Sequence, residues 1–125
     1  MSRHVVASPL GRIGEQIAAL HLQACGLVVL DRNWRYVAGG VRGEIDIVAR
    51  DGGAVVFCEV KARRGHGAGG PLAAVTGRKQ AQLRRLAVGW LSATGTRASE
   101  LRFDVIGVCW SESGCAEIVH LRGVC

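Results

Sequence analysis

Two runs of apolar, largely β-branched residues on either side of a short turn constrain the fold of this chain most. The runs span Glu44 to Arg50 and Ala54 to Ala62, and Asp51-Gly52-Gly53 lies between them. Valine and isoleucine favour extended backbone, and Asp-Gly is a typical turn between paired antiparallel strands. The pattern therefore predicts a β-hairpin.

Helical spacing predicts a helix on each side of this hairpin. The first spans Arg12 to Ala24, and Cys25-Gly26 supplies a glycine suited to end it. The second follows Pro71 and is longer. Its apolar residues recur at i, i+3, i+4, i+7 and i+8, and they are Leu83, Leu86, Ala87, Trp90 and Leu91.

The remaining segments complete a layered α/β domain. Leu27 to Leu30 and the polar stretch after it predict a strand that ends at a Gly39-Gly40 turn. Leu101 to Val108 and Glu117 to Leu121 predict two closing strands around a polar turn at Ser111 to Gly114. Arg63 to Gly70 holds four glycines and predicts a mobile loop. The order is helix, three strands, helix, two strands.

The composition limits the class of protein. A chain of 125 residues that is 49% apolar predicts one domain spanning residues 1–125, and it excludes a disordered or fibrous chain. No apolar run approaches the ~20 residues of a membrane-spanning helix, and Met1 to Gly11 lacks the apolar stretch of a secretion signal. We therefore expect a cytoplasmic protein without a membrane partner. Five cysteines without a C-x-x-C pair predict no disulfide framework.

The charge favours an anionic partner. The net charge is +6, and fourteen of the sixteen basic residues are arginines. Nucleic acid is the usual partner of an arginine-rich excess. A surface charge that only keeps the domain soluble is the alternative.

Alternation along the hairpin places charges among residues that favour burial. Glu44, Asp46 and Val48 share one side of their strand, and Ile45, Ile47 and Ala49 take the other. On the next strand Val55, Phe57, Glu59 and Lys61 lie opposite the apolar set Val56, Cys58, Val60 and Ala62. A two- or four-residue turn would place Asp46 beside Glu59, whereas a three-residue turn would pair Asp46 with Cys58.

Two buried carboxylates side by side predict a cation between them. Each is costly to bury alone, and the two repel each other. Mg²⁺ or Mn²⁺ would resolve both problems, with Asp46 and Glu59 as ligands and the carbonyl of Val60 as a third oxygen. Lys61 would then orient or help to deprotonate an attacking water and offset charge on a phosphate. A salt-bridged polar face without function is the alternative.

These residues also carry a family resemblance. Gly43 to Gly52, followed by Val56 to Arg63, resembles the D…E-x-K core of the PD-(D/E)xK nucleases. The chain is more closely similar to the bacterial YraN family, whose members are predicted to be nucleases resembling archaeal Holliday junction resolvases. The similarity covers Gly11 to Leu121 and includes Gly14-Glu15, Ala74-Val75-Thr76, Arg78-Lys79-Gln80 and Arg102 to Val105.

The resemblance implies a restriction-endonuclease-like fold, with a central mixed β-sheet flanked by helices. It implies Asp46, Glu59 and Lys61 as catalytic residues and Glu15 as an additional acid from the first helix. The chain departs from the pattern at two positions. Ile45 stands where the superfamily's name has proline, and Ala62 stands where threonine is usual in the family. Neither departure removes a ligand.

Several other residues are candidates for binding nucleic acid. Lys79 lies one turn before Leu83 and should point inward, toward the site or a phosphate. Arginines on both sides of the glycine loop could hold a nucleic-acid backbone, and they are Arg63, Arg64, Arg78, Arg84 and Arg85. Ordinary solvated side chains are the alternative for all of them.

Other polar and aromatic residues have structural interpretations. For Trp34, Tyr36 and Trp110 we expect packing rather than base stacking, and for Asp104 with Arg102 a structural ion pair. The spacing of Cys109, Cys115, His120 and Cys125 lacks the short ligand pairs of common zinc sites.

Together these features predict a metal-dependent endonuclease that hydrolyses phosphodiester bonds in nucleic acid, and we expect branched, flapped or single-stranded DNA rather than RNA as its partner. The branched substrate follows from the resolvase likeness alone. A homodimer would suit a two-fold substrate. One alternative is a nucleic-acid-binding module without turnover on the same scaffold. Another is a domain whose basic face binds an acidic protein.

Overall fold

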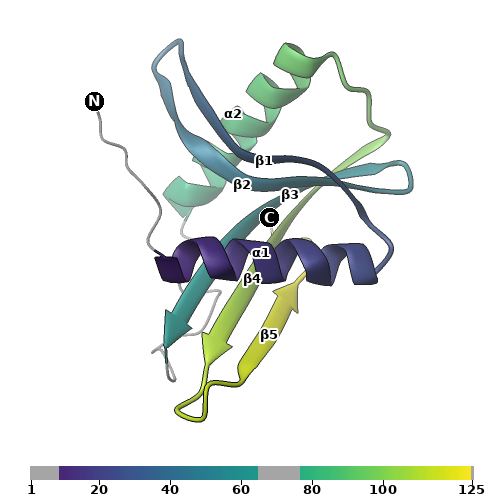
Figure 1. The fold of residues 1–125 in the computed structure, drawn as a ribbon. Coiled ribbons are helices and arrows are strands. Elements are labelled where there is room, and N and C mark those ends of the chain that lie inside the picture. Colours follow the sequence, from purple (N-terminus) through teal and green to yellow (C-terminus); the bar gives the residue numbers. More distant parts are fainter. Residues whose placement is uncertain (1–8, 65–76, 125) are drawn as a thin grey trace.

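A five-stranded mixed sheet with one helix on each face forms the fold (Figure 1). The computed structural model describes residues 9–64 and 77–124. Its elements in chain order are α1 (Pro9–Ala24), β1 (Val28–Ala38), β2 (Val41–Asp51), β3 (Ala54–Arg64), α2 (Gly77–Thr94), β4 (Glu100–Trp110) and β5 (Ala116–Leu121). These are the helices and strands that the sequence predicts, in the same order.

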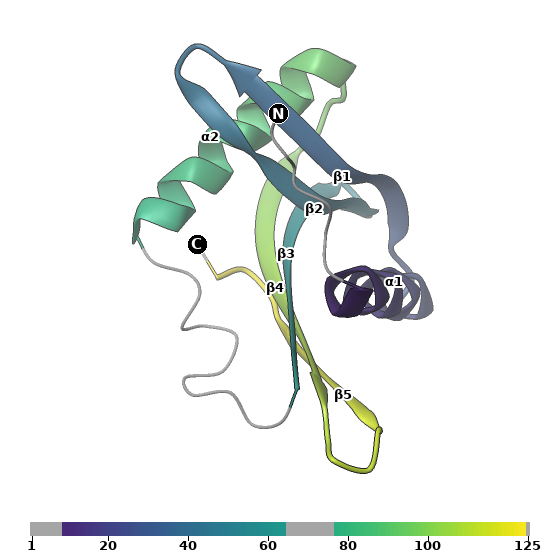
Figure 2. The ribbon, with the colours of Figure 1, turned by 60° about the vertical axis from the view of Figure 1, so that its left-hand side comes forward.

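The strands are arranged in the order β1-β2-β3-β4-β5, and only β3 and β4 are parallel. The chain between these two strands includes α2, which is the usual crossover for a parallel pair. Figure 2 shows α1 and α2 on opposite sides of the sheet. The architecture is α/β and is consistent with a restriction-endonuclease-like fold.

Each face of the sheet has its own apolar core. On the α1 face, Ala18 and Leu22 pack against Ile47, Cys58 and Ile106. On the α2 face, Leu83, Leu86 and Trp90 pack against Val48 and Phe57. This explains why the strands of the hairpin alternate between two apolar sides instead of showing one polar face.

Glycines allow the turns that the sequence predicts. Gly26 ends α1 with a φ of 92°, and the N–H groups of Gly26 and Leu27 donate to the carbonyls of Gln23 and Leu22. This pattern is a Schellman cap, in which the left-handed residue is best a glycine. Gly39-Gly40 turns β1 into β2 with φ values of 57° and 81°.

The β2–β3 turn settles the register of the hairpin. Asp51 pairs with Ala54 and Ile47 pairs with Cys58, so the turn has two residues, Gly52 and Gly53. Continued by one step, this register places Asp46 opposite Glu59, as the two-residue alternative requires. The predicted glycine loop begins later than expected, because Arg63 and Arg64 still belong to β3. The rest of that loop, with Ala74-Val75-Thr76, lies outside the described residues.

One prediction about the faces of β2 is wrong. Ile45 was expected on the side of Ile47 and Ala49, but it packs with Val48 in the α2 core, whereas Ile47 lies in the α1 core. The alternation breaks at Asp46, and it breaks in β1 as well at Asn33, which has a φ of 54°. The pairs on either side of Asn33 and Asp46 are Arg32 with Ile47 and Trp34 with Ile45. The β1–β2 ribbon therefore twists at this point and continues alongside α2 (Figures 1 and 2).

Close contacts hold the turned ribbon on α2. A β-carbon on Gly89 would lie 2.8 Å from the ring of Tyr36, and one on Gly43 would lie 2.7 Å from Gln82. Tyr36 also stacks on Trp34, with ring centroids 5.0 Å apart. Packing is thus the role of these two aromatic residues, as predicted, and Trp110 packs likewise against the α1 core.

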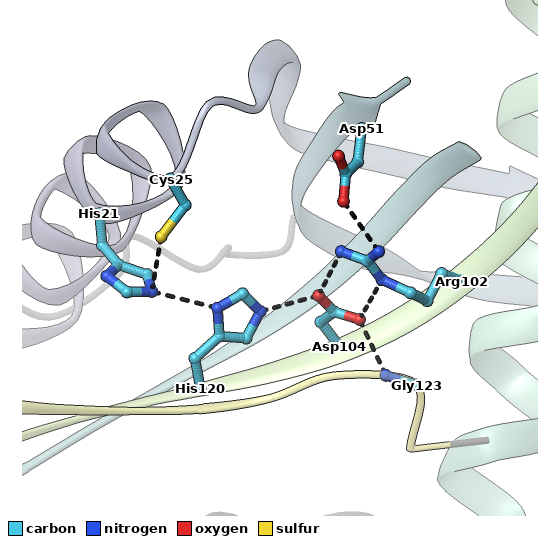
Figure 3. Close-up of polar contacts among 7 residues, drawn as sticks. All are labelled: His21, Cys25, Asp51, Arg102, Asp104, His120 and Gly123. Carbon is cyan, nitrogen blue, oxygen red and sulfur yellow. Dashed lines mark hydrogen bonds and ion pairs between the residues drawn. The ribbon is translucent and has the colours of Figure 1, made fainter. Parts of the chain in front are cut away.

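A polar network ties the far end of the sheet to α1 (Figure 3). Asp104, which is 1% exposed, accepts hydrogen bonds from Arg102, from the His120 ring and from the N–H of Gly123. Arg102 also donates to Asp51 at 2.9 Å, and His120 is joined to His21 by a 3.1 Å hydrogen bond. The predicted Arg102–Asp104 ion pair is confirmed.

This network predicts a large loss of stability on Asp104→Ala. The change would leave His120 without a carboxylate and Arg102 with Asp51 alone, in a mostly buried position, at a cost of about 3 kcal/mol or more. Urea unfolding measures the loss. Glu100→Ala, an exposed position on the same strand, is the matched control and should change stability by less than about 0.5 kcal/mol. Equal effects of the two changes would contradict the role given to the network.

None of the helices in the described ranges is both long and apolar enough to cross a membrane.

Candidate active site

Asp46 and Glu59 come together at the point where β2 leaves β3. The carboxylate Oδ2 of Asp46 accepts the backbone N–H of Val60 at 2.8 Å. Glu59 is 6% exposed and lies on the α2 side of β3, in line with Val55 and Phe57. The charge of Glu59 is close enough to raise the pKa of Asp46. The structure therefore places the two predicted acids side by side.

The twist at Asp46 opens the edge of β3 at Val60. In the β2–β3 register Val60 would pair with Ile45, but the ladder ends at Ile47 and Cys58, and Ile45 turns to the α2 core. The side chain of Asp46 takes the N–H of Val60 in place of a main-chain carbonyl. A strand residue presents its N–H and C=O on the same edge. The carbonyl of Val60 therefore faces the edge where Asp46 lies.

Both lysines of the chain approach Glu59. Lys61 Nζ lies 3.4 Å and Lys79 Nζ 3.5 Å from the same oxygen, Oε2. Lys61 comes from β3 itself and Lys79 from the first turn of α2. The inward direction expected for Lys79 is confirmed.

Glu15 reaches the same cluster from α1. It is 8% exposed, and this burial raises its pKa, with smaller contributions from the charges of Glu44 and Glu59. A hydrogen bond from the side chain of Asn33 acts in the opposite direction. Sequence reasoning did not single out Asn33. Its signal was present, because asparagine is one of the few residues that tolerate a left-handed backbone within a strand.

The positions of Gly14 and Ala62 explain how Glu15 comes so close. A β-carbon on Gly14 would lie 2.7 Å from the β-carbon of Ala62 on β3. Only glycine lets the backbone of α1 approach β3 this closely. The small side chain of Ala62 is therefore part of the contact.

The electrostatics of the cluster are uneven. Burial and the charge of Glu59 raise the pKa of Asp46 to about 7, and Glu15 and Glu44 add to this effect. Within residues 9–64 and 77–124 both lysines pair with Glu59, and no cationic side chain pairs with Asp46. Glu44 is paired with Arg35 at 3.2 Å. Of these three acids, Asp46 is thus the one without a cationic partner among the described residues.

This donor set fits a hard divalent cation. Carboxylate and carbonyl oxygens are the ligands that Mg²⁺ and Mn²⁺ prefer, and Mg²⁺ commonly binds through one or two carboxylates while the rest of its shell is water or phosphate. Asp46 and Glu59 with the Val60 carbonyl form such a set. In the described part of the chain no three His, Cys, Asp or Glu side chains form a metal site by themselves. Within that part of the chain, Glu15 thus does not complete a three-carboxylate site with Asp46 and Glu59.

The predicted arginines are all on the surface. Arg63 and Arg64 end β3, and Arg78, Arg84 and Arg85 lie on α2; each is exposed. They thus lie on β3 and α2, the two elements that also supply Lys61 and Lys79.

Comparisons with known proteins identify the family of this chain. A model of the family described as "Uncharacterised protein family UPF0102" matches residues 14–108. This range includes Glu15, Asp46, Glu59, Lys61 and Lys79.

The chain belongs to the UPF0102 family. This is the YraN family of the sequence resemblance, a PD-(D/E)xK nuclease-like group. Among its relatives, the UPF0102 protein of Frankia alni is 48% identical over 114 residues, which are 91% of this chain and 92% of that protein. The UPF0102 protein of Mycolicibacterium smegmatis is 50% identical over 117 residues, covering 92% and 91%. That of Streptomyces coelicolor is 47% identical over 116 residues, covering 92% and 87%.

The raised pKa of Asp46 predicts that stability falls as pH rises. The folded protein holds the Asp46 proton up to about pH 7, whereas the unfolded chain loses it near 3.8. Ionising Asp46 therefore costs stability between about pH 4 and 7. Relative to wild type, Asp46→Asn should gain about 2–4 kcal/mol across this range in metal-free buffer and level off above it. Urea unfolding at several pH values measures the gain.

Glu117→Gln, an exposed change on β5, is the control and should follow wild type throughout. A difference between Asp46→Asn and wild type that does not vary with pH would contradict the charge assigned to Asp46.

The close approach of α1 to β3 predicts that a second substitution, at Ala62, rescues the stability lost on Gly14→Ala. Gly14→Ala should destabilise the protein by about 1–3 kcal/mol, because two β-carbons on rigid backbones would overlap. Adding Ala62→Gly removes the second β-carbon and should restore most of the loss, despite the usual penalty of glycine in a strand. A double-mutant cycle of urea unfolding measures the coupling. Additive losses would show that Gly14 does not matter through this contact.

Proposed function

We propose that this protein is a metal-dependent endonuclease that hydrolyses phosphodiester bonds in nucleic acid. One observation carries the proposal. Two mostly buried acids, Asp46 and Glu59, lie together with Lys61 on Glu59, while Asp46 has no cationic partner among the described residues. A purely structural salt-bridge cluster would instead pair each buried charge. Membership of a nuclease-like family supports the same conclusion.

The residues of the site have distinct roles in this proposal. Asp46, Glu59 and the carbonyl of Val60 hold Mg²⁺ or Mn²⁺. When bound, such an ion polarises the phosphate and makes the attacking water more acidic. The ammonium of Lys61 orients that water and offsets charge that builds on the phosphate. Glu15, whose pKa is raised by burial, assists from α1.

The reaction is an in-line displacement at phosphorus. The water oxygen forms a new P–O bond as the ester P–O bond breaks, and the leaving oxygen keeps the bonding electrons and takes up a proton. One water is added across the bond, which leaves a phosphate monoester and a hydroxyl end. The protein's contribution is to place these groups and to stabilise their charge.

Exposed arginines give the site a way to hold the polymer. Arg63 and Arg64 at the end of β3 and the arginines of α2 would contact backbone phosphates, which bind any sequence. DNA with a branch, flap or single-stranded feature is the proposed substrate, from the family likeness to resolvases. A homodimer would hold a substrate of two-fold symmetry.

Cleavage assays test the proposal. Wild-type protein with Mg²⁺ or Mn²⁺ should cut at least one of duplex, flap, four-way junction and single-stranded DNA. Asp46→Asn and Lys61→Ala should each lower the rate about 100-fold or more. Glu117→Gln on β5 should keep full activity. Activity that survives both site changes would refute the assignment of the site.

A thermal melt with added Mg²⁺ separates a nuclease from a binding module on the same scaffold. A bound ion stabilises wild type by mass action, and Asp46→Asn should abolish the rise in Tm. Oligonucleotide binding without cleavage and without any metal-dependent rise in Tm would favour the binding module.

A further inference from the structure

Glu59 is contacted by the only two lysines in the sequence. All fourteen other basic residues are arginines. Lys61 and Lys79 lie 3.4 and 3.5 Å from one oxygen of Glu59, although 18 residues and a change of element separate them. Lysine is a compact charge on a flexible stem, whereas arginine is a planar group suited to two-point contacts. The site thus uses the cation that can most easily change its partner.

The charges do not balance around this oxygen. Glu59 contributes one negative charge and faces two ammonium groups, and its side chain is only 8% exposed. Lys61 and Lys79 are 34% and 31% exposed, so both reach solvent from this contact. A divalent cation held by Glu59 would compete with both ammonium groups for the same oxygen and would repel them.

The two lysines differ in where they can turn. Lys61 is fixed on β3 two residues from Glu59. Lys79 is the third residue of α2, next to the exposed Arg78, in a first turn that contains no acidic residue. The start of a helix is also its positive end, which favours a phosphate there.

We propose that Lys79 is a phosphate-binding residue that Glu59 holds until a divalent cation takes the carboxylate, so that metal binding and nucleic-acid binding are coupled. This inference rests on the proposed function, because it assumes a cation at Asp46 and Glu59. It adds a residue outside the E-x-K motif and assigns it to substrate binding instead of the attacking water. Lys79 would then reach a phosphate next to the one being cut.

Binding of a fluorescein-labelled DNA strand, followed by anisotropy with and without Ca²⁺, tests the coupling. Ca²⁺ takes the same oxygen ligands, and a gel verifies that the DNA stays intact. We expect Ca²⁺ to raise the affinity of wild type at least tenfold at constant ionic strength. Lys79→Gln should retain less than a threefold gain, and Lys79→Arg, which keeps the charge, should recover part of it.

Arg84→Gln is the matched control on the same helix. Arg84 is exposed and would contact phosphates without touching Glu59. Its loss should weaken DNA binding equally with and without Ca²⁺, which leaves the gain unchanged. A Lys79→Gln gain equal to that of wild type, or an equal loss of gain in Arg84→Gln, would overturn the proposal.

Calorimetry of Ca²⁺ binding without DNA gives a second readout. Lys79→Gln should bind Ca²⁺ as tightly as wild type or tighter, because a competing positive charge is removed. Weaker Ca²⁺ binding would indicate that Lys79 only supports the structure of the site, and it would also overturn the proposal.

The two proposals fail in different ways. If wild type binds no Ca²⁺ or Mg²⁺, the metal site itself is wrong and the coupling fails with it. If wild type binds the ion and cuts DNA, but Lys79→Gln keeps the full gain, only the role of Lys79 is wrong.

Discussion

The departure of β2 from β3 at Asp46 is the feature on which the rest of the site depends. Up to Ile47 the two strands pair in a regular ladder. Beyond it, the β1–β2 ribbon turns onto α2, and the carboxylate of Asp46 replaces the lost backbone partner of Val60. One hydrogen bond thus satisfies the opened edge and holds an acid beside Glu59. The left-handed Asn33 makes the matching turn in β1 and holds Glu15 as well.

A comparison of two aspartates in the same sheet, Asp104 and Asp46, separates structure from proposed chemistry. Asp104 receives donors from a guanidinium, an imidazole and a backbone N–H, so both of its oxygens are satisfied. Asp46 receives one backbone N–H and lies among other acids, which raises its pKa to about 7. A fold can hold a fully partnered charge for stability alone. An incompletely compensated acid beside a second acid is the kind of site that binds a cation.

The fold and the principal site residues could be predicted from the sequence because they depend on local patterns. Alternation along β2 and β3 placed Asp46, Glu59 and Lys61, and the observed two-residue turn is one of the two turn lengths that would bring the predicted acids together. The helical spacing of Leu83, Leu86 and Trp90 gave α2 its buried side and Lys79 its direction. The predicted alternation of β2 failed where the strand turns at Asp46, so that Ile45 lies on the α2 side. There, packing of the ribbon on α2 outweighed the period of two that an isolated strand would keep.

The sequence by itself determined the types of element, their order and the acidic pair of the hairpin, since each follows from spacings of a few residues. Only the tertiary structure decided which residues far apart in the sequence come into contact. It joined Lys79 to Lys61 on a single oxygen, brought Asn33 to Glu15, and linked His21 to His120 across 99 residues. These contacts depend on how the helices and the ribbon cross the sheet. That crossing is set by the packing of whole faces, including the close approaches at Gly14 and Gly89, and no local spacing encodes it.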